Sequence, residues 1–295
     1  APATTWPAHR LRCVCFVMCL GSLTGCGGSP PSSPPAAAGD KPSQAVGRSS
    51  ESSTKQTEQK RGRRGPVTLD DALALAQHSL KTLEKVKDYT GEFSKRERVG
   101  GELLPEERDA AKIRHQPFSV YLKVIKPQSS AGQEVIYVEG RNDGNLIAHT
   151  TGFGSNVIGR LSLDPHGFLA TRSNRYTIKD VGLKNLVIKL LDLGKRKELF
   201  RESQVAISKV DFADRPCKQV EISSPHAIGD FRLAIARIVL DDEWDVPVHF
   251  ESHEWPAEGG DKPVLSETYS YYDLHFDVGL TDRDFDPDNP DYAFP

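Results

Sequence analysis

From Tyr89 to the C-terminus, apolar and polar residues alternate with a period of two in short runs. The clearest run has Phe118, Val120, Leu122 and Val124 on one side of the alternation, which is typical of a β-strand with one buried face. Further strands are predicted at 134–139, 205–212, 217–223, 231–240, 246–255 and 265–276. The chain is therefore expected to build most of its domain from strands.

The connections between these runs are short and rich in turn residues, such as Gly100-Gly101, Asp143-Gly144 and Asp164-Pro165-His166-Gly167. Connections of this length join antiparallel neighbours, because a parallel pair needs a crossover of a dozen or more residues. The pattern predicts an antiparallel meander and excludes an alternating βαβ array.

Two segments instead repeat their apolar residues at helical spacing. The first starts at the capping-box sequence Thr68-Leu69-Asp70-Asp71 and extends to about Asp88, and the second lies within 180–202. The predicted order is one helix, about five strands, a second helix and about five more strands. A sheet of that size tends to curl, and amphipathic helices need an apolar face to cover. We predict an α+β fold: a strongly curved, mostly antiparallel sheet, an open half-barrel, wrapped around two amphipathic helices.

The N-terminus has the organisation of a secretory signal. Four of the five cysteines fall within the first 26 residues, where Arg10 and Arg12 precede an apolar run that is too short to span a bilayer. Leu23-Thr24-Gly25-Cys26 resembles the bacterial lipobox, in which the cysteine receives a diacylglyceryl group and the chain is cut before it. We predict a signal peptide at 1–25 and lipidation of Cys26; the alternative is a buried N-terminal helix with incidental thiols. Cys217 is then the only other cysteine and is expected to be a small buried residue; the alternatives are an intermolecular disulfide or a redox role.

Residues 26–65 are predicted to be a disordered tether, and 66–295 a single ligand-binding domain. Positions 27–65 contain 5 Pro, 8 Ser and 6 Gly, so they bury too little apolar surface to offset the entropy of ordering. The basic end of the tether, from Lys60 to Arg64, fits either anionic lipid headgroups or a solvated linker. The domain has 29 basic and 38 acidic residues, and this excess of acid makes nucleic acid a poor partner.

No motif for nucleophilic, phosphate-binding or zinc chemistry is present, and neither an enzymatic activity nor a cofactor is predicted. The strongest metal candidate is His249, Glu251 and His253, which share one face of a predicted strand. These three residues span about 13 Å along the strand, which is too far for one ion. A half-buried sheet face is therefore the preferred interpretation, and a metal-dependent hydrolase is a distant alternative.

The C-terminal segment from Asp282 to Asp288 is rich in carboxylates that could bind Ca²⁺. It lacks the Gly and the closing Glu of an EF-hand loop. We expect instead a tail that docks on the domain through Phe285, Tyr292 and Phe294.

Several runs resemble an uncharacterised bacterial family, domain of unknown function 1571. They are 88–93, 97–101, 114–121, 134–140, 174–176, 181–183 and 280–285. More distantly, the element order and Pro247-Val248 at the start of an alternating strand resemble the LolA, LolB and RseB-like periplasmic proteins. The resemblance implies an open, curved sheet with helices as a lid over an apolar cavity that accepts acyl chains. It implies no catalytic residue.

The resulting hypothesis is a non-enzymatic lipoprotein of the cell envelope, anchored through Cys26 and facing the periplasm, that acts as an acceptor or sensor of lipid or lipoprotein acyl chains. Gly27 in place of Asp after the cysteine slightly favours the outer membrane. The alternative is an envelope protein-interaction module with a filled core. The candidate lipid-binding residues, each of which could instead be a plain core position, are Phe93, Phe118, Val120, Leu122, Ile136, Val138, Leu190, Phe231, Leu233 and Ile235.

Overall fold

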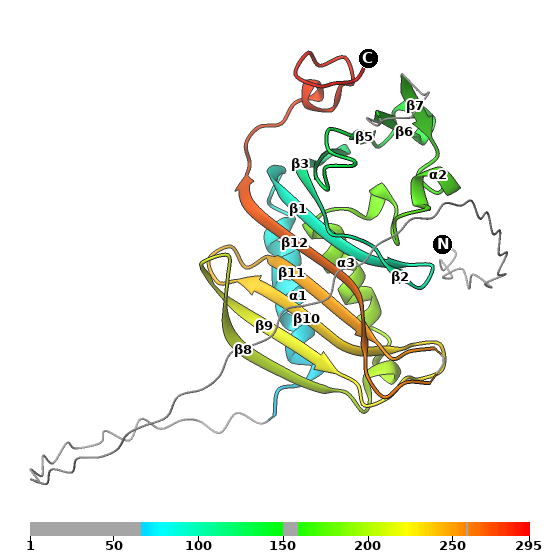
Figure 1. Ribbon diagram of the computed structural model, residues 1–295. Helices are drawn as coiled ribbons and strands as arrows, with labels where there is room; N and C mark the ends of the chain where they lie inside the picture. The colour runs from blue at the N-terminus through cyan, green and yellow to red at the C-terminus, as the bar shows by residue number, and fades with distance from the viewer. Residues whose placement is uncertain (1–65, 150–158, 258) are drawn as a thin grey trace, which may run out of the picture. The chain divides into compact units, whose positions relative to one another are not determined.

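An antiparallel sheet of twelve strands organises the described part of the chain, residues 66–149, 159–257 and 259–295 of the computed structural model (Figure 1). The order across the sheet is β7-β6-β5-β4-β3-β1-β12-β11-β10-β9-β8, with β2 paired to β1 alone. The strands are β1 (Asp88–Val99), β2 (Glu102–Leu103), β3 (Glu107–His115), β4 (Phe118–Lys126), β5 (Glu134–Val138), β6 (Leu146–His149), β7 (Arg160–Leu163), β8 (Gln204–Phe212), β9 (Arg215–Ser223), β10 (Leu233–Asp241), β11 (Pro247–Glu254) and β12 (Val264–Phe276).

The first and last strands of the domain meet in the middle of the sheet. β1 pairs with β12, in a register that sets Phe93 opposite Tyr271 and Glu97 opposite Glu267. One meander continues outward from β1 and the other from β12, which confirms the predicted antiparallel topology. The first meander has seven strands rather than about five, because β2, β6 and β7 are only two to four residues long, too short for a periodic pattern to identify them.

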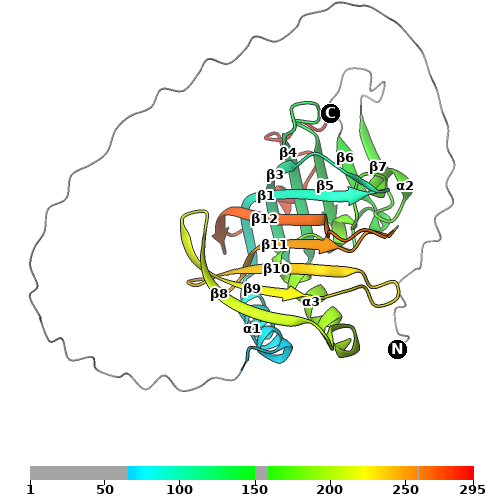
Figure 2. The ribbon, with the colours of Figure 1, turned by 60° about the horizontal axis from the view of Figure 1, so that its bottom comes forward.

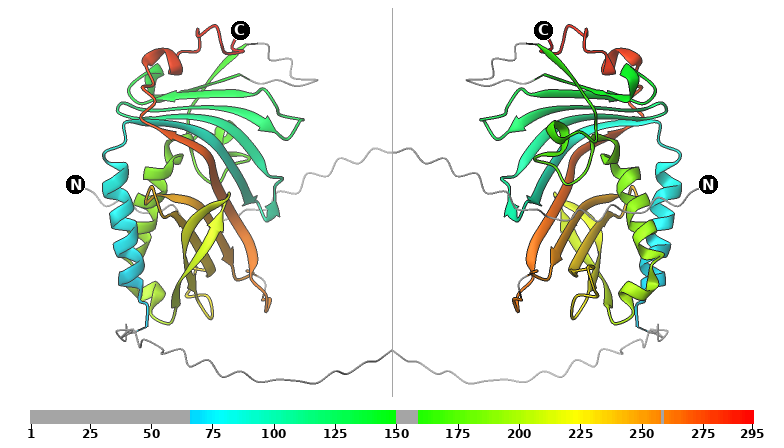
Figure 3. Two further views of the ribbon diagram at one scale, coloured as in Figure 1. Left: turned by 90° about the vertical axis from the view of Figure 1, so that its left-hand side faces the viewer. Right: turned by 90° about the vertical axis from the view of Figure 1, so that its right-hand side faces the viewer.

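Two amphipathic helices, α1 (Leu69–Leu83) and α3 (Leu183–Gly194), lie on one face of the curved sheet (Figures 2 and 3). The capping box of Thr68 and Asp71 is present. The first helix ends five residues earlier than predicted, and Asp88 already belongs to β1, where its carboxylate accepts the N–H groups of Gly279 and Leu280. The shorter helices are α2 (Phe168–Thr171), η1 (Asn142–Gly144), η2 (Ile178–Asp180), η3 (Lys197–Phe200) and η4 (Asp282–Phe285).

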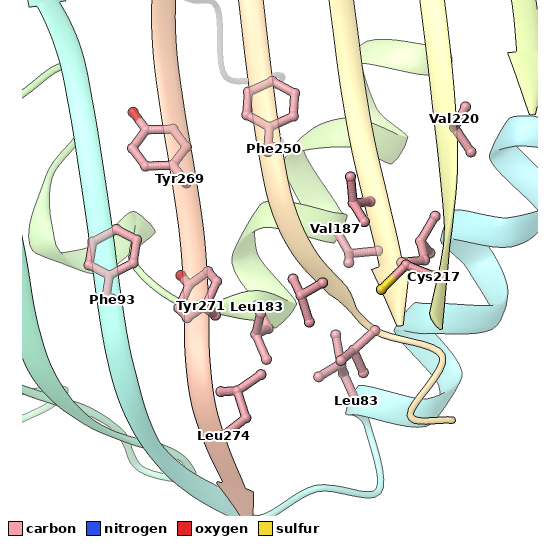
Figure 4. Close-up of a cluster of buried hydrophobic side chains, with 14 of the residues drawn as sticks. Leu83, Phe93, Leu183, Val187, Cys217, Val220, Phe250, Tyr269, Tyr271 and Leu274 are labelled. Carbon is pink, nitrogen blue, oxygen red and sulfur yellow. The ribbon is translucent and has the colours of Figure 1, made fainter. Parts of the chain in front are cut away.

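The main core lies between the helices and the concave face of the sheet (Figure 4). Leu83 of α1 and Leu183 and Val187 of α3 meet strand residues such as Phe250 and Leu274 there. The two helices are in direct contact with each other: a Cβ added at Gly194 would lie 2.3 Å from a methyl carbon of Leu73. Cys217 is 1% exposed within this core, as expected for a small buried residue.

A second, smaller core lies on the opposite, outer face of β4 and β5. The C-terminal segment covers it, and the ring of Tyr292 stacks on Tyr121 with 4.1 Å between centroids. Phe285 and Phe294 are buried in the same cluster, so the tail docks through the predicted aromatic residues.

The predicted signal peptide at 1–25, the lipidation site Cys26 and the tether at 26–65 lie outside the described residues. Within the described part, no helix combines the length and the apolar character needed to cross a membrane.

Candidate functional site

A cavity of about 290 Å³ opens between the start of α3 and the concave face of β3, β4 and β5. Its volume lies near the lower end of the range for small-molecule sites. The sheet side is lined by Ile113, His115, Phe118, Tyr137 and Glu139, and the helix side by Lys179, Val181, Gly182, Lys184 and Asn185. We call these ten residues the α3 pocket.

The backbone at the start of α3 is fixed closely against the sheet. Gly182 has φ 115°, and a Cβ at this position would lie 3.1 Å from the hydroxyl oxygen of Tyr89. That hydroxyl accepts the N–H of Leu183 at 2.8 Å. The side-chain amide of Asn185 donates to the carbonyl oxygens of Lys179 and Val181, at 2.9 Å each. The helix side of the pocket is therefore held in one conformation by its own hydrogen bonds.

The α3 pocket has an apolar floor and a charged rim. Ile113 and Tyr137 are buried, whereas Lys179 and Glu139 are exposed and Lys184 is half-buried. Lys179 lies 5.8 Å from the ring centroid of Tyr137, a cation–π contact. Among the ionised lining residues, the rim carries one more cation than anion.

His115 contributes a neutral imidazole to the pocket. Its Nδ1 lies 2.7 Å from the carbonyl oxygen of Val86, so Nδ1 carries the proton and donates it. Burial lowers the pKa of His115, and the nearby charge of Lys184 adds to this effect. The Nε2 atom is buried and has no hydrogen-bond partner among the described residues.

A second polar feature, the Arg175 clamp, ties the segment between α2 and α3 to the sheet. It consists of Arg175, Glu97, Glu254 and Glu267. The Arg175 guanidinium contacts Glu254 at 2.9 Å and Glu267 at 3.1 Å, and its backbone N–H donates to Glu97 at 2.9 Å. The Tyr269 hydroxyl donates its proton to Glu97 at 2.5 Å, and its oxygen also lies 3.1 Å from a carboxylate oxygen of Glu267. Three strands, β1, β11 and β12, are thereby joined to one arginine.

The charges in the clamp are buried to different degrees. Glu97 and Glu267 are only 4% and 5% exposed, whereas the Arg175 side chain keeps 30% of its surface. Burial raises the pKa of Glu267 although the charge of Arg175 opposes it. Burial would lower the pKa of Arg175, but the charges of Glu267 and Glu254 outweigh it and raise that pKa.

Asp109 lies next to this region, on the concave face of β3, and differs from the clamp acids. It is 1% exposed, and neither carboxylate oxygen has a hydrogen-bond partner among the described residues. Burial raises its pKa to about 7, the charge of Glu107 adds to the rise, and Lys95 opposes it. Lys95 is itself engaged by Glu107 at 2.8 Å and Asn174 at 2.5 Å.

The ten predicted lipid-binding residues do not form one site. Phe118 alone lines the α3 pocket. The residues of the main core, either buried in it or packed against it, are Phe93, Phe118, Val120, Leu122, Leu190, Phe231 and Leu233.

The other three predicted residues are not in the main core. Ile136 and Val138 lie in the outer cluster under the C-terminal segment. Ile235 pairs with His253 and so shares that residue's face of the sheet, while its neighbour Ala236 is in the main core. The prediction that these three residues line the cavity on the concave face is therefore wrong. Apolar side chains occupy both faces of these strands.

Two of the three metal candidates are engaged in other contacts. Nδ1 of His249 lies 2.8 Å from the hydroxyl of Ser270, and Glu251 pairs with Arg237 at 2.6 Å. Within the described ranges no three His, Cys, Asp or Glu residues gather as a metal site. In the C-terminal segment, Asp282 pairs with Arg114 at 2.9 Å and Asp284 with Lys112 at 2.8 Å.

Reasoning from the sequence did not single out the pocket rim or the clamp. The signal lay in the runs that carry the family resemblance. Six of the ten pocket residues fall in those runs: His115, Phe118, Tyr137, Glu139, Val181 and Gly182. Glu97 and Arg175 of the clamp do so as well. Nothing within the runs indicated that these residues meet in space.

The fold and the site define a class of protein: a curved antiparallel half-barrel with a small pocket between the sheet and a covering helix. The chain belongs to the family described as protein of unknown function (DUF1571), which matches residues 86–294. The search of curated proteins gave no match.

Solved structures with some similarity include a DUF1329 family protein from Desulfovibrio piger, at 11% identity and TM-score 0.36, covering 74% of this chain and 97% of that one. The Mycobacterium tuberculosis lipoprotein LppX has 10% identity and TM-score 0.40, covering 71% and 96%. A LolA superfamily protein from Nitrosomonas europaea has 12% identity and TM-score 0.31, covering 72% and 97%. All three scores are below 0.5, and we transfer no function from these proteins.

Proposed function

We propose that this protein is a non-enzymatic lipoprotein of the cell envelope, anchored through Cys26, that binds an acyl chain between its sheet and α3 as an acceptor or sensor. One observation carries the proposal: the α3 pocket has an apolar floor of Ile113, Phe118 and Val181 that continues into the main core. The lipobox-like sequence at Leu23–Cys26 supports the anchor, and the outer membrane is the favoured location.

Acyl-chain binding of this kind draws its free energy from burial, about 0.8 kcal/mol for each methylene removed from water. Buried side chains of the main core pack beside the pocket, between the sheet and the helices. A chain longer than the pocket can therefore enter only if α3 shifts away from the sheet, so α3 would act as a lid.

The filled core also supports a second candidate, an envelope protein-interaction module. Phe168 and Leu169 of α2 are 78% and 58% exposed, which is unusual for two adjacent large apolar side chains. In that case the contact with the partner, rather than a ligand cavity, would carry the function.

The acyl-binding proposal predicts that the full chain with Cys26→Ser, purified without detergent, retains acyl species in native mass spectrometry. Val181→Trp places an indole in the pocket and should remove them. Ile188→Trp is the control, because Ile188 lies on α3 outside the pocket lining and is 38% exposed. Thermal unfolding of both variants checks that they fold. Absence of acyl species from the parent, or equal loading of both tryptophan variants, would contradict the proposal.

The anchor is tested separately. Cys26→Ser should move the protein from the membrane fraction to the soluble fraction, because the thiol that carries the lipid is gone. Cys19→Ser, inside the predicted signal, should leave it membrane-bound. Membrane retention of the Cys26 variant would overturn the anchor, and density separation of the parent protein's membranes tests the outer-membrane assignment.

A further inference from the structure

The rim of the α3 pocket has two cations without ion-pair partners. In the described residues neither Lys179 nor Lys184 forms a salt bridge, although the domain has more acidic than basic residues. By contrast, Lys189 of α3 pairs with Asp180 at 3.1 Å. The two pocket lysines are therefore free to contact a ligand.

The two lysines are also carried by a pre-organised segment. The amide of Asn185 holds the carbonyl of Lys179, and the Tyr89 hydroxyl holds the N–H of Leu183, the residue before Lys184. A ligand would then order the side chains but not the backbone, which reduces the entropic cost of binding.

We propose that the α3 pocket is specific for an anionic amphiphile, with the carboxylate or phosphate of the ligand at Lys179 and Lys184 and its apolar chain on Ile113, Phe118 and Val181. This inference rests on the proposed acyl-binding function and narrows its ligand class. Ammonium groups form charge-assisted hydrogen bonds to both kinds of anion. The apolar lining beside them favours a ligand that also carries an apolar chain.

The charge on the rim also separates two sources of acyl chains. A free fatty acid or a phospholipid presents an anion next to its chains. The acylated, diacylglyceryl-modified cysteine of a lipoprotein has ester and amide linkages there and no charge. The pocket is therefore matched to the first group and not to lipoprotein acyl chains.

Glu139 gives this inference a second, independent test. It is the one carboxylate among the ten lining residues and lies exposed on the same rim. An anion bound at the two lysines is repelled by Glu139, so Glu139→Gln should strengthen the binding of an anionic ligand, whereas a neutral ligand should not respond.

The experiment measures calorimetric affinity of the full chain carrying Cys26→Ser for decanoate, decyl phosphate, decanol and inorganic phosphate. The double variant Lys179→Gln with Lys184→Gln should weaken the binding of decanoate and of decyl phosphate about tenfold and leave the affinity for decanol unchanged. The charge-matched control is Lys195→Gln with Lys209→Gln, exposed positions outside the pocket, which should change no affinity. Glu139→Gln should increase the affinity for decanoate several-fold.

Each outcome is decisive. Equal binding of decanoate to the parent and the pocket double variant overturns the head-group inference and leaves the acyl-binding function standing. If neither decanoate, decyl phosphate nor decanol binds, both the head-group inference and the acyl-binding function are overturned. Inorganic phosphate binding as tightly as decyl phosphate would make the pocket a phosphate site and overturn the amphiphile assignment. A preference for decyl phosphate over decanoate, with both lost in the double variant, supports the inference and points to a phospholipid source.

Discussion

The segment that runs from α2 into the first turn of α3 meets the sheet in two different ways. At Arg175 it is tied to acids on three strands through buried ion pairs and hydrogen bonds. A few residues later, from Lys179 to Asn185, it borders a cavity, and its lysines have no ion-pair partner in the described part of the chain. This segment thus has a closed end at Arg175, where ion pairs hold it to the sheet, and an open end at the α3 pocket, where a ligand has room.

The closed end carries a free-energy cost in the folded protein. Burying Glu97 and Glu267 costs desolvation free energy, and a paired arginine only offsets this cost. Such a cluster is better suited to fixing position than to adding stability. The clamp thereby fixes the part of the chain that leads toward α3.

The largest effect is expected from breaking the closed end. Arg175→Met should lower the free energy of unfolding by about 3 kcal/mol, because Glu267 is left buried without its cation. This value is at the low end for buried pairs, since the Arg175 side chain is 30% exposed. Urea denaturation measures the change.

Arg232 provides the control for this variant. Its guanidinium lies 3.9 Å from Glu254, an acid that Arg175 also contacts, and its side chain is 31% exposed. It has no contact with Glu267 among the described residues, so Arg232→Met should cost less than about 1 kcal/mol. Equal losses in the two variants would show that the clamp is an ordinary surface ion pair and would remove the contrast between the two ends.

The architecture was predictable because it depends on local patterns. Period-two alternation predicts the strands, and the Thr68–Asp71 capping box predicts the start of a helix. The face of each strand was less predictable. Ile136 and Val138 alternate like lining residues, yet the C-terminal segment covers them from the outside. Alternation separates two faces of a strand but does not reveal which one the helices cover.

The site was not predictable because it depends on long-range register. Glu97 and Glu267 are 170 positions apart, and they become neighbours only through the pairing of β1 with β12. The α3 pocket likewise needs the start of α3 to meet β3 and β5, which no local run of residues specifies. The family resemblance marked several of these residues but gave them no arrangement.

A smaller effect is expected at Asp109, the unpartnered acid beside the clamp. Its pKa is about 7 in the folded protein against an ordinary value of 3.8, so the folded state holds the proton more tightly. The stabilising contribution of that proton is complete below about pH 4 and is lost as the pH rises through 7. A pKa rise of this size corresponds to at most about 4 kcal/mol.

Asp109→Asn should therefore gain stability relative to the parent as the pH increases from 4 to 8. We expect about 2 kcal/mol at pH 8, roughly half the limit, because a buried amide at this site also lacks partners. Urea denaturation across this pH range measures the difference. Asp282→Asn is the control of opposite sign: hydrogen bonds from Arg114 and Arg141 lower the pKa of Asp282, so its loss should destabilise the protein at neutral pH and matter less in acid. If the stabilities of the two variants relative to the parent change with pH in the same direction, Asp109 is ionised and has hydrogen-bond partners in the folded protein. Asp109 would then not differ from the acids of the Arg175 clamp.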